Sequence, residues 1–227
     1  MAFQALPARL AHVRETIAER QRAAGWTHPV RIVAVTKGHG VEAVLAAAAA
    51  GLDAVGENRV QEALAKQEVA QDVAISWHLI GTLQRNKVRH AVGRFALIQS
   101  VDRADLAREL SGRIPAGNRQ SVLVQVNCSG EPQKGGVEPD ALPELLEVLA
   151  GLGNLDLRGL MTMAALTEEE AVQRRAFALL RQLRDAGERA GHALPELSMG
   201  MSGDYGPAVE EGATIVRLGT VLFGERS

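Results

Sequence analysis

Short runs rich in Val, Ile and Leu alternate with longer helical patterns along most of this sequence, and this alternation constrains the fold more than any other feature. The eight runs begin at Arg31, Leu52, Ala74, Phe95, Ser121, Leu155, Pro195 and Ala213. The intervals between them carry Ala, Leu, Glu, Gln and Arg at helical spacing. Strands that alternate with helices indicate βαβ units and a parallel sheet.

The number of these units predicts how the sheet is arranged. About eight βα units within 227 residues are typical of a single closed (β/α)8 barrel of the TIM type. An amphipathic stretch at the N-terminus adds one extra helix, and no linker divides residues 1–227, so a single domain is expected. The run around Asp53 is short, which leaves an open doubly wound sheet as the alternative.

Local signals predict where the longest helix begins and ends. Thr167 and Glu170 have the spacing of a capping box at its start. Gly191 lies just past its far end, where a left-handed glycine is common. Residues 129–140 are rich in turn-forming Gly, Pro and Asp, so they are expected to form a long surface loop.

Charge and composition exclude several classes of partner. Lys and Arg number 25 against 27 Asp and Glu, and aromatic residues make up 3%. Without a basic surplus or stacking side chains, nucleic acid is not an expected partner. No apolar run is long enough to cross a bilayer, and the single Cys128 cannot form an internal disulfide, which fits a reducing compartment. We therefore expect a cytoplasmic protein without a membrane partner.

Polar residues follow the apolar runs, at the C-terminal ends of the expected strands, where (β/α)8 barrels carry their active sites. Lys37 is the sharpest of these candidates, because it follows the first run with the same strand parity as Val33 and Val35. A lysine amine that apolar neighbours keep neutral is a nucleophile toward carbonyl groups. The alternative is a lysine whose ammonium group extends into solvent at the strand end.

Two segments near the C-terminus end their apolar runs with small and hydroxyl residues, SMG from Ser198 and RLGT from Arg217. Glycine N–H groups and Ser or Thr hydroxyls together can bind a phosphate. The loops after the last two strands are also the usual phosphate site of such barrels. Tight turns are the alternative reading of these glycines. A lysine on the first strand combined with phosphate donors on the last two is a more specific pattern than either alone.

Cysteine and histidine are less informative. Cys128 has no nearby His and is expected to be an inert thiol at a strand end. The six His residues show no metal-binding spacing, so no metal is expected. His78 ends a strand, where it either orients a site residue or satisfies a backbone carbonyl.

Seven segments carry a more specific pattern when taken in order: AVTK from Ala34, GENRVQE from Gly56, WHLIGTLQRNK from Trp77, QVNCSGEPQKGG from Gln125, GLMTM from Gly159, LSMGMSGDYGPAVEEG from Leu197 and VRLGTVLFGER from Val216. Between residues 32 and 226 the chain thereby resembles the pyridoxal phosphate homeostasis proteins, relatives of the barrel domain of alanine racemase. The resemblance implies that Lys37 carries pyridoxal 5′-phosphate as an internal aldimine. The other positions it implies are Ser198, Gly219 and Thr220 for the phosphate, Arg217 for the pyridine nitrogen, Asn58 and His78 for the ring pocket, and Met163 and Met199 near the cofactor.

The same resemblance implies a protein that stores, buffers or delivers pyridoxal phosphate without turnover of its own. Arg217 would donate to the ring nitrogen and keep it unprotonated, which makes the ring a weaker electron sink. The racemase relatives take a second base, a tyrosine, from an additional domain, whereas the only tyrosine here is Tyr205. The alternatives are a small racemase or lyase that uses the cofactor, and a Schiff-base aldolase of phosphorylated sugars that does not. Apoenzymes that need pyridoxal phosphate are implied partners, and a monomer is expected.

Overall fold

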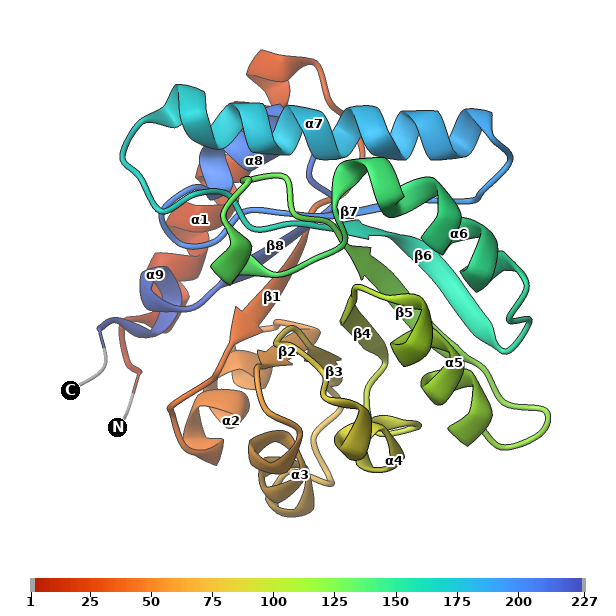
Figure 1. Ribbon diagram of the computed structural model, residues 1–227. Helices are drawn as coiled ribbons and strands as arrows, with labels where there is room; N and C mark the ends of the chain where they lie inside the picture. The colour runs from red at the N-terminus through yellow and green to blue at the C-terminus, as the bar shows by residue number, and fades with distance from the viewer. Residues whose placement is uncertain (1–2, 226–227) are drawn as a thin grey trace.

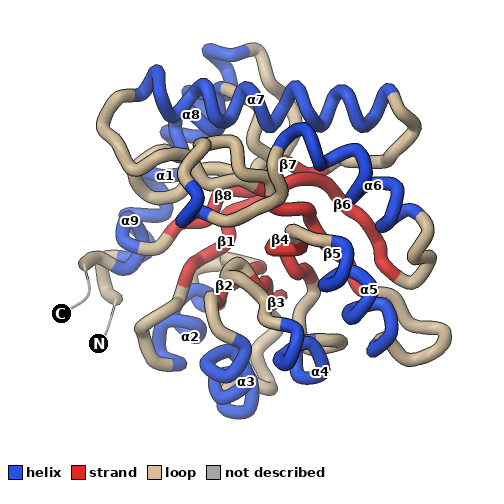
Figure 2. Tube along the Cα trace, viewed as in Figure 1, coloured by secondary structure: helices blue, strands red, loops and turns tan. Residues whose placement is uncertain are grey.

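Eight parallel strands close into a barrel in the computed structural model, which describes residues 3–225. The strands pair in chain order and β1 pairs with β8, so the predicted closed barrel is confirmed and the open sheet is excluded. Figure 2 shows the strands in red at the centre and the helices in blue around them. The strands are β1 Arg31–Val35, β2 Ala54–Glu57, β3 Ser76–Leu79, β4 Leu97–Val101, β5 Gln120–Gln125, β6 Leu155–Met161, β7 Glu196–Ser198 and β8 Ile215–Leu218.

Helices follow the strands and cover the outside of the barrel (Figure 1). The segment between β7 and β8 also contains a short helix, which the helical patterns do not predict because Gly206 and Pro207 resemble a turn. Within residues 3–225, none of the helices could cross a membrane, because none is both long and apolar enough. The helices are α1 Leu6–Ala24, α2 Val41–Ala49, α3 Val60–Val69, α4 Val88–Ala91, α5 Ala104–Arg113, α6 Leu142–Ala150, α7 Glu170–Arg189, α8 Tyr205–Glu210 and α9 Thr220–Phe223.

The ends of α7 agree only partly with the sequence signals. The helix begins at Glu170, and the predicted capping box is wrong, because the Thr167 hydroxyl accepts from the Glu169 N–H and Thr167 lies outside the helix. At the other end the prediction is confirmed, since Gly191 follows the helix with a φ of +99°. A glycine is required there because other residues rarely adopt this backbone conformation.

The barrel interior holds an apolar cluster and a set of polar side chains. The apolar cluster is formed by Val33, Ala54, Leu97, Leu123, Met161 and Ile215. Because side chains two residues apart share a face of a strand, Gln99 follows Leu97 into the interior and Arg217 follows Ile215. His78 and Ser198 are also buried and contact Gln99. Four buried polar side chains from β3, β4, β7 and β8 therefore lie inside the barrel.

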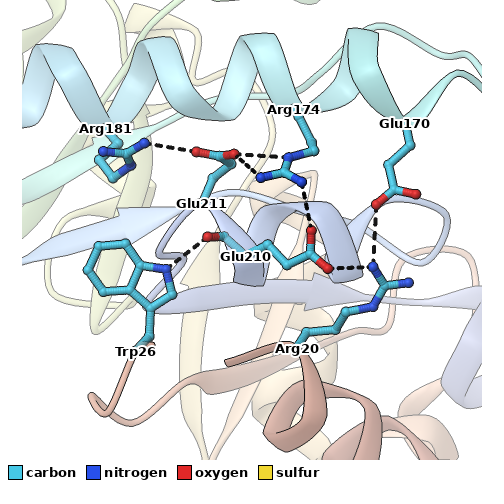
Figure 3. A network of polar contacts seen from close by, with 7 residues as sticks. All are labelled: Arg20, Trp26, Glu170, Arg174, Arg181, Glu210 and Glu211. Carbon is cyan, nitrogen blue, oxygen red and sulfur yellow. Dashed lines mark hydrogen bonds and ion pairs between the residues drawn. The ribbon is translucent and has the colours of Figure 1, made fainter. Parts of the chain in front are cut away.

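The extra N-terminal helix packs against α8 and α9. Its apolar face buries Leu6, Leu10, Val13 and Ile17, which follow a helical spacing. A network of charged side chains joins it to α7 and α8 (Figure 3). In this network Arg20 contacts Glu210 at 2.5 Å and Glu170 at 3.3 Å, while Glu211 accepts from Arg174 and Arg181.

Candidate functional site

Lys37 lies two residues beyond the end of β1, at the C-terminal face of the barrel. Its side chain is half-buried. The same strand places Val33 in the interior of the barrel, and Lys37 lies in the turn that follows the strand. The predicted lysine is therefore at the end of the barrel where such folds bind ligands.

A buried ion pair fixes the backbone next to Lys37. Lys66 on α3 contacts Glu57 at the end of β2, with 2.5 Å between Nζ and Oε1. The same Nζ donates to the Thr36 carbonyl at 2.8 Å, and the Thr36 hydroxyl donates to Glu57 Oε1 at 2.5 Å. This cluster is not predicted from the sequence, although Glu57 belongs to the GENRVQE segment. Thr36, which directly precedes Lys37, is thus held through both its backbone carbonyl and its side-chain hydroxyl.

Asn58 follows β2 and is half-buried at the same face. Its backbone is approached closely by Gly81, where an added Cβ would lie 2.3 Å from the Asn58 carbonyl oxygen. The Gly81 carbonyl in turn accepts from the Ser100 hydroxyl at 2.7 Å. Only glycine permits this approach, so Gly81 and Ser100 support the position of Asn58.

Gly219 and Thr220 follow β8, which is the neighbour of β1 in the closed barrel. The N–H groups of Gly219 and Val221 converge on one oxygen, the Ser202 hydroxyl, at 3.1 and 3.2 Å. A serine hydroxyl that accepts two hydrogen bonds keeps its own proton to donate. The Ser202 proton suits a phosphate oxygen, whereas the Gly219 and Val221 N–H groups are engaged by Ser202 itself. Ser202 was not among the predicted residues, although it follows Ser198 in the same SMGMS segment.

Arg217 is buried in the barrel interior and held by two neutral acceptors. Its Nη1 donates to the Ser198 hydroxyl and its Nη2 to the Thr162 carbonyl, both at 2.8 Å. Burial lowers the pKa of Arg217 to about 10, and the charge of Asp204 opposes this shift. The guanidinium is therefore still protonated at neutral pH. Among residues 3–225, no carboxylate forms an ion pair with it.

Ser198 and His78 lie in the same interior chain of hydrogen bonds. The Ser198 hydroxyl donates to Gln99 Oε1 at 2.6 Å, and Gln99 Nε2 lies 2.9 Å from His78 Nδ1. A phosphate needs donors, and the only proton of Ser198 is already used, so its expected phosphate role stays a prediction. His78 lines a cavity of about 220 Å³ at the N-terminal ends of the strands, together with Arg31 and Asp53.

The remaining candidates fall in three environments. Met163 packs against the interior cluster, whereas Met199 belongs to the core between the barrel and the helices. Burial raises the pKa of Cys128 to about 12, so the thiol stays protonated and unreactive at neutral pH, as expected. Tyr205 begins α8 and packs against the main core. In the part of the chain that the structure describes, His, Cys, Asp and Glu side chains form no group of three that could hold a metal.

The structure thus brings Lys37, Asn58 and Gly219 to one face of the barrel. Neighbouring strands supply Lys37 and Gly219, and an added Cβ on Gly219 would lie 3.5 Å from the Val35 carbonyl. Arg217 and Ser198 contact each other deeper in the same barrel. A second cavity, of about 670 Å³, lies at the opposite end between α1 and the beginnings of β1, β7 and β8, and it contains none of the predicted residues.

Comparison with known proteins bears on this arrangement. Residues 9–227 match the family described as the alanine racemase N-terminal domain. A pyridoxal phosphate homeostasis protein of Aquifex aeolicus is 51% identical over 178 residues, which make up 78% of this chain and 78% of that protein. One of Pseudomonas aeruginosa is 46% identical over 96% of this chain and 94% of that protein.

A solved structure extends the likeness to three dimensions. PipY of Synechococcus elongatus, with pyridoxal phosphate bound, matches with a TM-score of 0.79 and 40% sequence identity over 92% of this chain and 100% of that one. The sequence relatives, the family match and the closed barrel agree with one another. The chain belongs to the alanine racemase N-terminal domain family and, within it, to the pyridoxal phosphate homeostasis proteins.

Proposed function

We propose that this chain binds pyridoxal 5′-phosphate covalently through Lys37 and takes part in homeostasis of that cofactor, as one domain that holds and delivers it. The observation that carries the proposal is that the half-buried Lys37 and the backbone of residues 219–221, which holds the Ser202 hydroxyl, follow neighbouring strands at one face of the barrel. The names of the relatives and the bound ligand of PipY support the same reading.

Each residue at the C-terminal face has a role in this proposal. The cofactor would supply an aldehyde, and the Lys37 amine would bind it covalently with loss of one water. The Ser202 hydroxyl would donate to the phosphate, beside the backbone of Gly219 and Thr220, and Asn58 and Met163 would flank the ring. Arg217 donates to the ring nitrogen, because a protonated guanidinium can only donate. The ion pair of Glu57 and Lys66 holds the backbone at Thr36, so that the Lys37 amine is presented at a fixed position.

We also propose that the chain has no substantial catalytic turnover. Arg217 keeps its proton at neutral pH, so it cannot pass one to the ring nitrogen and turn the ring into a stronger electron sink. Tyr205, the only tyrosine of the sequence, is partly buried and packs against the main core. The implied partners are apoenzymes that receive the cofactor, and we infer a monomer, which sedimentation velocity tests.

Reduction with borohydride followed by peptide mapping tests the attachment point. The wild type should yield one reduced adduct on Lys37 and an absorption band in the visible range, and both should be lost in Lys37→Ala. Lys87→Ala is the matched control, since it removes another lysine of the same chain and should keep the adduct. An adduct on any residue other than Lys37 overturns the assignment.

Exchange of the α-proton of amino acids tests the absence of turnover. With pyridoxal phosphate bound, alanine should exchange its α-proton for deuterium far more slowly than about 1 s⁻¹, the lower end of typical enzyme rates. Exchange at or above that rate, lost in Tyr205→Phe, would show a racemase or lyase instead. Delivery is measured by the activation of a pyridoxal phosphate-dependent apoenzyme mixed with the loaded protein.

A further inference from the structure

With the Gln99 amide oriented as in the structure, Oε1 toward Ser198 and Nε2 toward His78, the interior chain of hydrogen bonds runs in one direction. Arginine donates and never accepts, so the Ser198 oxygen must accept from Arg217 Nη1. Its proton is donated to Gln99 Oε1, the amide atom that faces it. Its Nε2 then faces His78 and donates to Nδ1, so the proton of a neutral His78 is on Nε2.

The surroundings of His78 favour this neutral form. The side chain is 3% exposed, and burial lowers its pKa to about 4, with Arg31 adding to the shift and Asp53 opposing it. Arg158 and Glu196 are the other charged groups that line the cavity beside it. A protonated His78 would present an N–H to the Gln99 N–H. The Gln99 amide would then have to turn over, and the Ser198 proton would lose its acceptor.

We propose that His78 and Gln99 are positioning residues, which act through Ser198 to hold the Arg217 guanidinium at the orientation in which it meets the cofactor ring. This inference rests on the proposed function for the ring contact, but the chain of hydrogen bonds exists in the protein itself. It assigns His78 a role that begins at the far end of the barrel from Lys37. The four side chains come from β3, β4, β7 and β8. Their hydrogen bonds run from the cavity that His78 lines to the Thr162 carbonyl, just past the end of β6, which accepts from Arg217.

Nuclear magnetic resonance of the cofactor-free protein tests this chain of hydrogen bonds without any ligand. In ¹⁵N spectra His78 Nδ1 should be unprotonated and Nε2 protonated at neutral pH. The guanidinium N–H signals of Arg217 should exchange slowly with water, and they should exchange faster in His78→Leu. A proton on His78 Nδ1, or Arg217 exchange that does not change in His78→Leu, overturns the proposal.

Two variants of His78 separate the hydrogen bond from the bulk of the ring. His78→Leu removes the acceptor, whereas His78→Asn places an amide oxygen near the former Nδ1 position and restores it. Affinity for pyridoxal phosphate should fall about tenfold in His78→Leu, the factor that 1.4 kcal/mol represents, and the absorption maximum of the bound form should shift. His78→Asn should restore the affinity to within about twofold of the wild type, a difference smaller than the contribution of a typical hydrogen bond. It should also restore the absorption maximum.

Leu97→Ala is the matched control for general loosening of the interior. Leu97 lines the same cavity as His78, but its apolar side chain takes no part in the chain of hydrogen bonds. This variant should lower the stability of the barrel and leave the absorption maximum unchanged. An equal spectral shift in Leu97→Ala, or equal behaviour of His78→Leu and His78→Asn, contradicts a role through the hydrogen bond.

The two kinds of measurement distinguish failure of this inference from failure of the proposed function. If the wild type binds no pyridoxal phosphate, the proposed function fails. The spectra of the cofactor-free protein alone then decide whether the chain of hydrogen bonds from His78 to Arg217 exists. If the wild type binds the cofactor and His78→Leu matches it in affinity and absorption, the positioning role fails while the proposed function stands.

Discussion

Two buried cations in this protein have opposite surroundings. Lys66 lies outside the barrel wall, between α3 and β2, and pairs with the carboxylate of Glu57 at 2.5 Å. Arg217 lies inside the barrel and contacts a hydroxyl and a carbonyl, both neutral. Burying a charge is costly unless a partner and hydrogen bonds compensate it. The first cation has its counter-charge within the fold, whereas the second has two good acceptors and no carboxylate among the described residues.

This difference separates a structural charge from one that is available to a ligand. The Lys66 pair is complete, and its effect is local, since it fixes the carbonyl of Thr36 beside Lys37. Arg217 still has N–H groups beyond the two that are engaged, and a ligand with an acceptor would complete its surroundings. The comparison predicts that removal of Lys66 lowers stability and that removal of Arg217 lowers affinity instead.

Lys66→Met should produce the largest loss of stability. It leaves the Glu57 carboxylate buried without its cation, and Glu57 Oε2 already has no hydrogen-bond partner in the described part of the chain. Breaking a buried pair from one side costs about 3–5 kcal/mol. Urea unfolding of the cofactor-free protein measures this loss. The double variant Lys66→Met with Glu57→Leu should regain part of it, and a double variant less stable than Lys66→Met would contradict this account.

His78 should give the second largest effect, through pH. Its pKa is about 4 in the folded protein against 6.5 in the unfolded chain, because burial disfavours the charged ring. Between these values the unfolded state binds a proton that the native state does not, so stability falls as pH falls from 6.5 toward 4. Above pH 6.5 the titration of His78 does not reduce the free energy of unfolding. Between pH 6.5 and about 4 it lowers that free energy by about 1.4 kcal/mol per pH unit, a total loss of about 3 kcal/mol.

The matched variant isolates this contribution from the titration of carboxylates. His78→Asn keeps the acceptor for Gln99 but does not titrate. Urea unfolding of both proteins, repeated from above pH 6.5 down to about 4, should show the wild type losing stability faster than the variant. Parallel curves would mean that His78 is not held neutral in the native state.

The sequence predicts the parts of this protein that depend on local order. Each of the eight strands is marked by its apolar run, and Lys37 and Gly219 follow strands directly, so parallel topology alone brings them to one face. Strand parity also explains why Gln99 follows Leu97 and Arg217 follows Ile215 into the interior. Short-range helix signals are less reliable: Thr167 has the spacing of a cap but lies outside the helix.

The interior chain could not be predicted in the same way. Ser198 and Gln99 are 99 positions apart, and their contact depends on the register and curvature of a closed sheet. Gln99 within an apolar strand looks like any polar residue in a half-buried position. Ser202 was missed for a related reason, since only the backbone path after Gly200 decides which serine of SMGMS meets the Gly219 N–H. These contacts are non-local, and a single sequence carries no sign of them.

Arg217→Met tests the other side of the comparison. Loss of a charge-assisted hydrogen bond costs about 1.5–3 kcal/mol, so affinity for pyridoxal phosphate should fall by one to two orders of magnitude. Stability of the cofactor-free protein should change by only about 1 kcal/mol, because the removed desolvation penalty offsets the two lost acceptor contacts. Titration calorimetry and urea unfolding measure the two quantities. If stability falls as far as in Lys66→Met and affinity does not change, Arg217 is a structural cation like Lys66.

Arg20→Ala should have the smallest effect, because its guanidinium is partly exposed to solvent. Arg20 joins α1 to Glu170 on α7 and Glu210 on α8, and its side chain is 38% exposed (Figure 3). Exposed ion pairs contribute about 0.2–1 kcal/mol, since water screens them and the long side chains lose freedom. The loss in Arg20→Ala should shrink further in about 1 M salt, where the Debye length is about 3 Å. The hydrogen bond from the Trp26 indole to the Glu210 carbonyl, at 2.8 Å, does not depend on Arg20 and keeps the segment after α1 in place. A loss comparable to that of Lys66→Met, and unchanged by salt, would mean that burial does not separate structural charges from surface ones in this fold.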